Sequence, residues 1–423
     1  MKERYYRPEL DALRFFAFAT VFLHHAPWHS PRPVLNHESR ISEGLPYAAH
    51  PSGLAVIQNY GATAPFQTLQ QSFRLGAIHD ACGFGLCIFF LLSAYLIVTI
   101  LLREKDTTGS VSLSSFAARR ILRIWPLYFL ILAIAFVLGR FLLQVSVHWH
   151  ALVAFSVLLG NLYILKHGWI LETINPLWSL SVEEQFYLVI PGLTRVGGRK
   201  ALAVICWLTI ATSYLVLVWL GHRHSIALVG VWANSFVQFQ FFAAGGLIAL
   251  SRSRRKVSMS TLSRLWLSSA GFVMWYIASA RFELLSFKPS TAPQLVVGYL
   301  LVLAGTAAIF LAVLDTSRKV PKTVLYLGKI SYGLYLFHQL VLWIVFETGS
   351  SYAPFVFFKN HTAVGVVVAL SAIIAAASLS YHFFERPILL FKTRFETVKT
   401  RAASSPFRKK VPCPVGPPVK SLN

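Results

Sequence analysis

Charged residues are scarce in this sequence. Aspartate, glutamate, lysine and arginine together make up 13% of its 423 residues, whereas hydrophobic residues make up 56%. A typical soluble domain carries about 25% charged residues. So few charges cannot cover a molecule of this size with a hydrated surface, which excludes an ordinary soluble enzyme and an intrinsically disordered chain.

Acidic residues and cysteines are scarcer still. The chain has 16 acidic against 39 basic residues, a formal net charge of +23. Such an excess can indicate nucleic-acid binding, but the apolar bulk argues against a nucleic-acid partner. The four cysteines form no Cys-x-x-Cys pair and no disulfide framework: Cys82, Cys87, Cys206 and Cys413. The sequence predicts no bound metal and no resident cofactor.

Long apolar runs, in contrast, recur along the whole chain. A membrane-spanning helix needs about 20 apolar residues. We therefore expect an all-α, polytopic membrane protein with about ten transmembrane helices, at 10–28, 79–102, 124–146, 148–165, 201–220, 226–250, 265–282, 294–314, 330–347 and 362–384. An eleventh run, 178–194, is interrupted by serine, glutamate and glutamine, and predicts a polar re-entrant or tilted helix.

The basic residues indicate how the chain is oriented. They gather near the N-terminus, in the tail, and in the loops 103–123, 195–200, 251–264 and 318–329. Such segments stay on the cytoplasmic side. Ten spans place all of them inside, with both termini cytoplasmic, if 178–194 does not cross the bilayer. We expect a multi-pass protein of the plasma or inner cell membrane, with a membrane domain at 1–390, an outside loop at 29–78 and a flexible basic tail at 391–423.

The first run carries ionisable residues at helical spacing. Asp11 and Arg14 are three residues apart and can pair on one helix face. His25 follows Arg14 by eleven residues, so the two share a face about 16 Å apart along the axis. This pattern favours proton chemistry or an acyl relay at His25, with Arg14 and Asp11 as electrostatic partners. The alternative is a juxtamembrane ion pair and an interfacial histidine.

Two later segments also place polar residues on one face. In 177–191, the residues Ser179, Glu183 and Tyr187 recur every four positions, so Glu183 is the predicted proton acceptor or substrate ligand. The alternative is an amphipathic helix on the membrane surface. In 327–342, the same kind of face holds Ser331, Tyr335 and His338, although a lone histidine in a span is more often a packing residue.

Three arginines precede the third run: Arg119, Arg120 and Arg123. Guanidinium groups fixed at the cytoplasmic end of a helix suit phosphate recognition. Anchoring of the topology by positive charge would explain them equally well. Ser93, within the apolar segment 83–98, is typical of close helix packing.

Six motifs together resemble the integral-membrane O-acyltransferases of acyltransferase family three. From Arg7 to Pro387 they read RPELDALRFFAFATVFLHH, FFLLSAYLI, FAARRILRIWPLY, LWSLSVEEQFYLVIP, LGKISYGLYLFH and YHFFERP. The resemblance matches the family's first-span signature to Arg14 and His25, its polar-segment glutamate to Glu183, and its arginines to Arg119, Arg120 and Arg123. Two features depart from the family: Ser93-Ala94-Tyr95 stands where members often have SGF or SGY, and the histidine is doubled as His24-His25.

The resemblance implies transfer of an acyl group, commonly acetyl, from cytoplasmic acyl-CoA to a hydroxyl. The acceptor would be a sugar in a polysaccharide, lipopolysaccharide, peptidoglycan or glycolipid. We expect catalysis by His25, Arg14, Asp11, Glu183 and His338, and substrate binding by Arg119, Arg120, Arg123, Trp178, Ser179, Tyr187, Ser331 and Tyr335.

The chemistry of the residues is compatible with acyl transfer. A thioester is already activated, so the protein must mainly position a hydroxyl and remove its proton. His25 suits a general base, and it equally suits a covalent acyl carrier. Arg14 or Tyr335 would stabilise the developing oxyanion. The competing interpretation is a transporter or channel, which commonly shows two related halves; the sequence shows no internal repeat.

Overall fold

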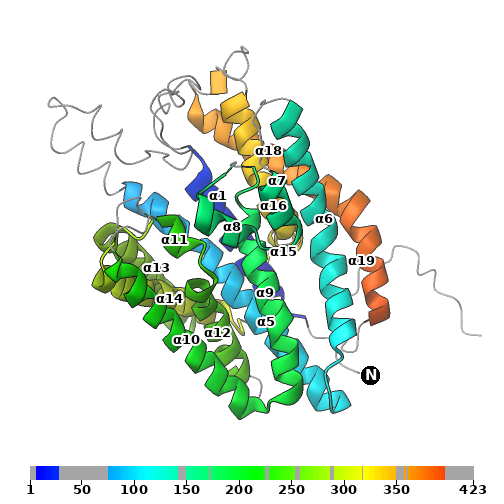
Figure 1. Cartoon of the computed structure of the whole chain (residues 1–423), viewed down its shortest axis with the longest axis vertical. Helices are drawn as coiled ribbons and strands as arrows, with labels where there is room; N and C mark the ends of the chain where they lie inside the picture. Colours follow the sequence, from blue (N-terminus) through cyan, green and yellow to red (C-terminus); the bar gives the residue numbers. More distant parts are fainter. Residues whose placement is uncertain are drawn as a thin grey trace, which may run out of the picture.

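In the computed structural model, the described residues are 6–27, 75–141, 149–170, 173–223, 228–252, 258–285, 290–316, 318–348, 357–358 and 361–395. Within these ranges the chain is helical, without β-strands (Figure 1). This confirms the predicted all-α class. Residues 28–74, most of the predicted outside loop, and 396–423, most of the predicted tail, lie outside the described ranges, so the domain boundaries stay predictions.

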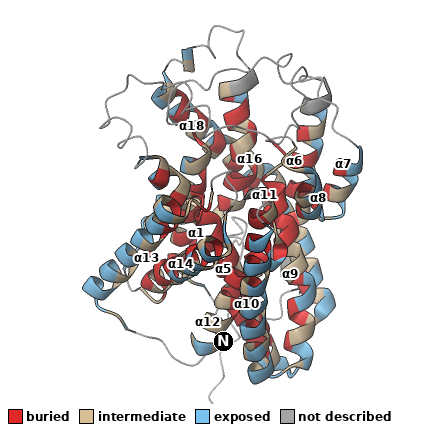
Figure 2. Cartoon of the chain, turned by 60° about the vertical axis from the view of Figure 1, so that its left-hand side comes forward, coloured by how far each residue is buried: buried red, intermediate tan, exposed pale blue. Residues whose placement is uncertain are grey.

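The helix that begins at Leu75 and continues as α5 (Gly85–Thr108) is central. In its most apolar stretch 78% of the residues are buried, whereas the value for α10 (Arg199–His222) is 22%. Against α5 pack α1 (Pro8–His25), α12 (Ser235–Arg252) and α14 (Ala292–Val313). The outer layer contains α10 and α13 (Thr261–Phe282), whose exposed faces point outward (Figure 2).

A second group of helices lies on the other side of α1. It contains α6 (Leu113–Phe141), α15 (Lys322–Lys329), α16 (Ser331–Trp343), α18 (Thr362–Ser380) and α19 (Arg386–Lys392). Two π-helical turns, Ile344–Thr348 and Tyr381–Glu385, and a 3₁₀ turn, Thr393–Phe395, complete it. The α1 helix packs on both α15 and α16. Gly328 of α15 lies so close to α1 that a Cβ there would overlap the backbone carbonyl of Asp11.

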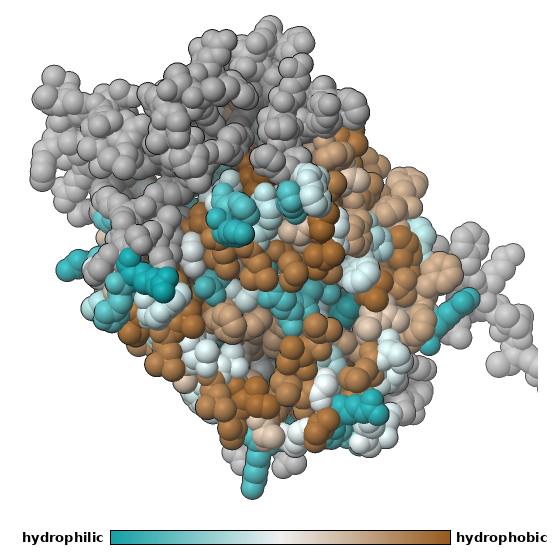
Figure 3. All heavy atoms as spheres, in the orientation of Figure 1, coloured by the Kyte–Doolittle hydropathy of each residue, from teal (hydrophilic) through white to brown (hydrophobic). Residues whose placement is uncertain are grey.

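Much of the described surface on the face shown in Figure 3 is hydrophobic, as expected of a protein surrounded by lipid. On α10, for example, Trp207 is 62% exposed and Leu215 is 70% exposed. Within the described ranges, five helices are long and apolar enough to cross a membrane, and the pair α15–α16, bent by 70°, makes a sixth if it is one broken span. These helices support a multi-pass membrane protein. The predicted number of about ten spans is not confirmed.

The predicted single span at 148–165 is wrong. This segment forms two eight-residue helices, α7 (Trp149–Ser156) and α8 (Gly160–His167). Between them Leu158 adopts a φ of 61°, a left-handed conformation that interrupts a helix. The buried Tyr128 hydroxyl donates to the Phe155 carbonyl at 2.7 Å. Gly160 fits because any Cβ there would meet the Phe155 ring.

The polar run 178–194 forms one continuous helix, α9 (Leu177–Val196). A helix of 20 residues is about 30 Å long, which is enough to cross a bilayer. A buried amide network holds it in place: Gln185 donates to Asn161 of α8 at 2.9 Å and accepts from Ser235 of α12 at 2.6 Å. The broken element of this region is therefore α7–α8, and α9 is intact.

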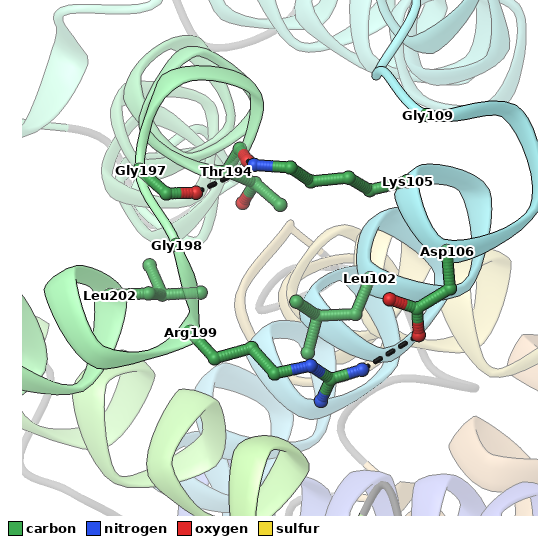
Figure 4. Close-up of a pocket in the computed structure, with 9 residues that line it drawn as sticks. All are labelled: Leu102, Lys105, Asp106, Gly109, Thr194, Gly197, Gly198, Arg199 and Leu202. Carbon is green, nitrogen blue, oxygen red and sulfur yellow. Dashed lines mark hydrogen bonds and ion pairs between the residues drawn. The ribbon is translucent and has the colours of Figure 1, made fainter.

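A pocket of about 280 Å³ separates the C-terminal ends of α5 and α9 from the start of α10 (Figure 4). Lys105 reaches across it and donates to the carbonyls of Thr194, Arg195 and Gly197 at 2.7–3.1 Å. Arg199 pairs with Asp106 at 2.7 Å. Both cations contact groups of the protein itself, and these contacts hold α9 and α10 against α5. The pocket is therefore a poor candidate for the catalytic site.

Candidate functional site

Two histidines from opposite ends of the sequence face each other. His25 ends α1, and its ring centroid lies 5.0 Å from that of His338 in α16. His338 is fully buried, and its Nδ1 bonds the Tyr335 carbonyl. A carbonyl only accepts, so Nδ1 carries the hydrogen and Nε2 of the neutral ring holds a lone pair. Among the described residues this buried Nε2 has no hydrogen-bond partner.

The neutral His25 ring has the same tautomer. Its Nδ1 lies 2.9 Å from the Val21 carbonyl, one turn earlier in α1, and therefore donates to it. Nε2 is left as a proton acceptor, which is the form a general base requires. The two rings thus offer two proton acceptors, which a sugar with two hydroxyls could satisfy by donating one hydrogen to each.

A hydroxyl pair connects this histidine pair to α9. The Tyr335 ring lies 5.3 Å from the His338 ring, and its hydroxyl lies 2.8 Å from the Ser179 hydroxyl. Both hydroxyls also donate to the Pro176 carbonyl just before α9. Tyr335 of the predicted polar face of 327–342 therefore meets Ser179 of the predicted polar face of 177–191, and Ser179, Tyr335 and His338 are buried.

Glu183 lies one turn further along α9, about 6 Å from Ser179 along the axis. Its carboxylate accepts hydrogen bonds from the hydroxyls of Ser93 and Tyr187. These two hydroxyls lie 2.5 Å apart. Glu184 turns away, toward Trp125 and Tyr128 of α6. The Ser179–Glu183–Tyr187 stripe thus faces the protein interior, as the helical spacing predicts.

One arginine acts on this carboxylate and is itself close to two others. The guanidinium of Arg120 lies 5.5 Å from the centroid of the Tyr187 ring and interacts electrostatically with Glu183. Arg14 in turn interacts with Arg120 and Arg123. Asp11 holds Arg14 at 2.6 Å, which confirms that these two residues pair on one face of α1. The three guanidinium groups are therefore close enough to act on one another, and Arg120 connects them to Glu183.

Arg119, by contrast, faces elsewhere. It is 5% exposed, pairs with the buried Glu104 at 3.1 Å and donates to the Phe395 carbonyl at 2.6 Å. These contacts connect α6 to α5 and to the end of the described chain. Arg119 therefore connects helices, whereas Arg120 lies beside Tyr187 and acts on Glu183.

Two other predicted substrate residues lie apart from these polar contacts. Trp178 packs among the rings of Phe90, Trp169 and Trp232 at centroid distances of 6.2–6.4 Å. Ser331 is buried at the bend between α15 and α16. Their predicted roles have no direct support from these contacts.

The sequence analysis missed two polar residues of the site. Ser93 looked like a packing residue because it is small and surrounded by apolar residues, yet it bonds Glu183. Glu385 is 9% exposed in the π-helical turn Tyr381–Glu385, where Ser380 donates to it at 3.3 Å and Arg123 acts on it electrostatically. Such π-helical turns are frequent at functional sites, but the sequence carries no clear signal for one.

Comparison with known proteins gives a consistent result. The family model described as "Acyltransferase domain" matches residues 7–382. A Listeria monocytogenes protein named peptidoglycan O-acetyltransferase is 23% identical over 328 residues, which cover 72% of this chain and 51% of that protein. A Bacillus subtilis protein provisionally named a peptidoglycan O-acetyltransferase is 28% identical over 341 residues, with 72% and 50% covered.

A Staphylococcus aureus protein provisionally named an O-acetyltransferase is 24% identical over 331 residues, which cover 72% of this chain and 52% of that protein. The chain spans about half the length of the curated relatives it matches. No solved structure matches the chain.

Proposed function

Because the chain belongs to the acyltransferase family whose domain covers residues 7–382, we propose that it is a membrane O-acyltransferase that uses cytoplasmic acyl-CoA, in the first place acetyl-CoA. The acceptor is a sugar hydroxyl of a cell-surface glycan or glycolipid. The names of the relatives, two of which refer to peptidoglycan, support such an acceptor. Family membership also decides against the transporter interpretation.

One observation carries the proposal: His25 faces His338, whose buried Nε2 has no partner among the described residues. A polar atom buried without a hydrogen bond costs about 1–3 kcal/mol, so it is best explained by a substrate that completes it. The acceptor sugar would sit between the two rings, with one of its hydroxyls donating to Nε2 of His338 and a second, the attacking hydroxyl, donating to Nε2 of His25. His25 would take the proton of the attacking hydroxyl while its oxygen attacks the thioester carbonyl, the C–S bond breaks, and the thiolate of coenzyme A leaves.

The inner polar groups suit the donor. Coenzyme A carries several phosphates, and Arg14, Arg120 and Arg123 offer three neighbouring guanidinium groups. Arginine binds phosphate through paired donors. Asp11 orients Arg14. The alternative role of His25, as a covalent carrier of the acyl group, uses the same Nε2 and stays open.

The direct test uses the purified protein in detergent or liposomes, without an ion gradient. Acetyl-CoA labelled in the acetyl group is supplied with a peptidoglycan fragment, and both coenzyme A release and acetylated product are measured. We expect both in the native protein and neither in His25→Ala. Release and transfer that persist in a folded His25→Ala protein would contradict the assigned base.

The acceptor is identified separately. Surface glycans from cells with and without the gene are compared by mass spectrometry, before and after mild alkali, which removes O-acetyl esters. We expect an alkali-labile acetyl group that depends on the gene. Identical glycans in both cells would overturn the proposed acceptor class. The use of acyl-CoA would be decided independently, by the assay with the purified protein.

A further inference from the structure

A cluster of potential metal ligands lies beside the histidine pair. One ring nitrogen each of His24 and His79 and a carboxylate oxygen of Asp80 lie within 4.8 Å of one another. His24 comes from the end of α1, while His79 and Asp80 come from the helix that leads into α5. The sequence analysis predicted no metal, and 55 residues separate His24 from His79 along the chain. None of the three side chains has a role in the proposed acyl transfer.

The orientation of His24 suits a metal ligand. Its Nδ1 lies 3.1 Å from the His79 carbonyl and therefore donates to it, which leaves the lone pair on Nε2. Histidines that bind metals are held in this way, with the second ring nitrogen donating to a carbonyl or a carboxylate. Gly83 leaves room for the ring, because a Cβ at this position would lie 3.2 Å from Cδ2 of His24.

The three side chains of the cluster form few short hydrogen bonds with one another. Asp80 lies 3.5 Å from Nδ1 of His79, which is longer than a normal hydrogen bond. All three residues are half-buried. The rings of His79 and His25 lie 5.2 Å and 5.1 Å from that of His24, so several electron-rich nitrogens are crowded together. A cation would relieve this arrangement.

We propose that His24, His79 and Asp80 bind one zinc ion. Two imidazoles and a carboxylate are a common set of three protein ligands for zinc, with a fourth position left for water or a substrate oxygen. With bonds of about 2.0–2.2 Å, tetrahedral ligands lie about 3.3–3.6 Å apart. The three ligand atoms lie within 4.8 Å of one another, so the side chains would rotate toward the ion on binding. The ion would connect the end of α1 to the helix before α5 and fix the residue next to His25.

The test measures zinc directly, on the full-length protein purified through a tag without histidines. Zinc content is determined after equilibration with a buffered zinc concentration, together with the thermal unfolding midpoint with and without zinc. We expect about one zinc per chain and a higher midpoint with zinc. His79→Ala and Asp80→Asn should each weaken zinc binding at least about tenfold.

His222→Ala is the matched control. His222 is an exposed histidine on α10 whose Nδ1 bonds the Val218 carbonyl at 2.7 Å, so it shares the ring orientation but not the cluster. This variant should keep the zinc of the native protein. Absence of stoichiometric zinc in the native protein, or equal zinc binding in Asp80→Asn, overturns the proposal. Asp80→Asn keeps the size of the side chain, and the zinc-free midpoint checks its fold. The readout needs no acyl donor, so it is independent of the proposed reaction.

Discussion

Neighbouring histidines at the end of α1 face different partners. His25 faces His338, with ring centroids 5.0 Å apart, whereas His24 faces His79, at 5.2 Å. The helical spacing from Arg14 already selected His25. The structure adds a second reason to assign the base to His25: its ring faces His338 of α16, which has a buried ring nitrogen.

His25→Ala should therefore lower acyl transfer by at least about 100-fold, the usual contribution of a general base. His24→Ala should lower it less, because the His24 ring is turned toward His79. Initial rates with acetyl-CoA and a glycan fragment give the comparison, with His222→Ala as an exposed control. An equal or larger loss in His24→Ala would move the base to that residue.

Glu183 and Glu184 provide a second comparison within one helix. Glu183→Gln keeps the size but weakens the contacts with the Ser93 and Tyr187 hydroxyls, and it removes the charge opposite Arg120. We expect a strong loss of turnover in Glu183→Gln and a smaller one in Glu184→Gln. Steady-state kinetics of both variants decide this. Full activity in both glutamine variants would show that neither carboxylate of α9 takes part in the reaction.

Substitution of the three arginines of α6 should affect different properties of the protein. Arg119→Ala leaves the buried Glu104 without its cation, and breaking such a pair costs about 3–5 kcal/mol. Arg120→Ala and Arg123→Ala should instead weaken acyl-CoA binding, and lysine at either position should not fully restore it. Thermal unfolding and acyl-CoA titration in detergent measure the two effects. If both folded variants bind acyl-CoA with unchanged affinity, these arginines serve only to fix the membrane topology.

At the level of elements, the periodicity of polar residues predicted which side chains share one helix face. It did not predict which side chains meet between different helices. Ser179, Glu183 and Tyr187 share a face because they share a helix. Nothing in the sequence brings Ser93 to Glu183, or His79 to His24, since these contacts come from packing. The break at Leu158 was also hidden, because an apolar run does not report its backbone angles. Arg119 and Arg120 look alike in sequence, but only Arg119 meets Glu104.

The contact between α5 and α9 can be tested at Lys105. Lys105→Met removes the donor to three carbonyls at the end of α9. Hydrogen bonds from a charged donor are worth about 1.5–3 kcal/mol each, and partial exposure to water reduces this to about 1–2 kcal/mol in total. The thermal midpoint in detergent should fall accordingly. Lys200→Met, an exposed control on α10, should leave it unchanged; equal midpoints for both variants would refute the contact.

At the level of the whole molecule, the split of 148–165 preserves the expected orientation. If α7–α8 does not cross, and α9 does, then 195–200 and 251–264 still lie on the same side as 103–123. The two changes compensate, so the distribution of basic residues still predicts cytoplasmic termini.

Cysteine labelling of intact cells checks this orientation. In a protein whose native cysteines are replaced by serine, Ser258→Cys should resist a membrane-impermeant thiol reagent until the cells are opened. Ser42→Cys, in the predicted outside loop, should react at once. Labelling of Ser258→Cys from outside would reverse the predicted topology.

The contact between Gly328 and Asp11 has a mechanical consequence. No side chain separates α15 from α1, and α15 continues into α16 across a 70° bend. A side chain at residue 328 would push α15, and with it the start of α16, away from α1. Because His25 lies on α1 and His338 on α16, the distance between the two rings depends on a position that carries no side chain of its own.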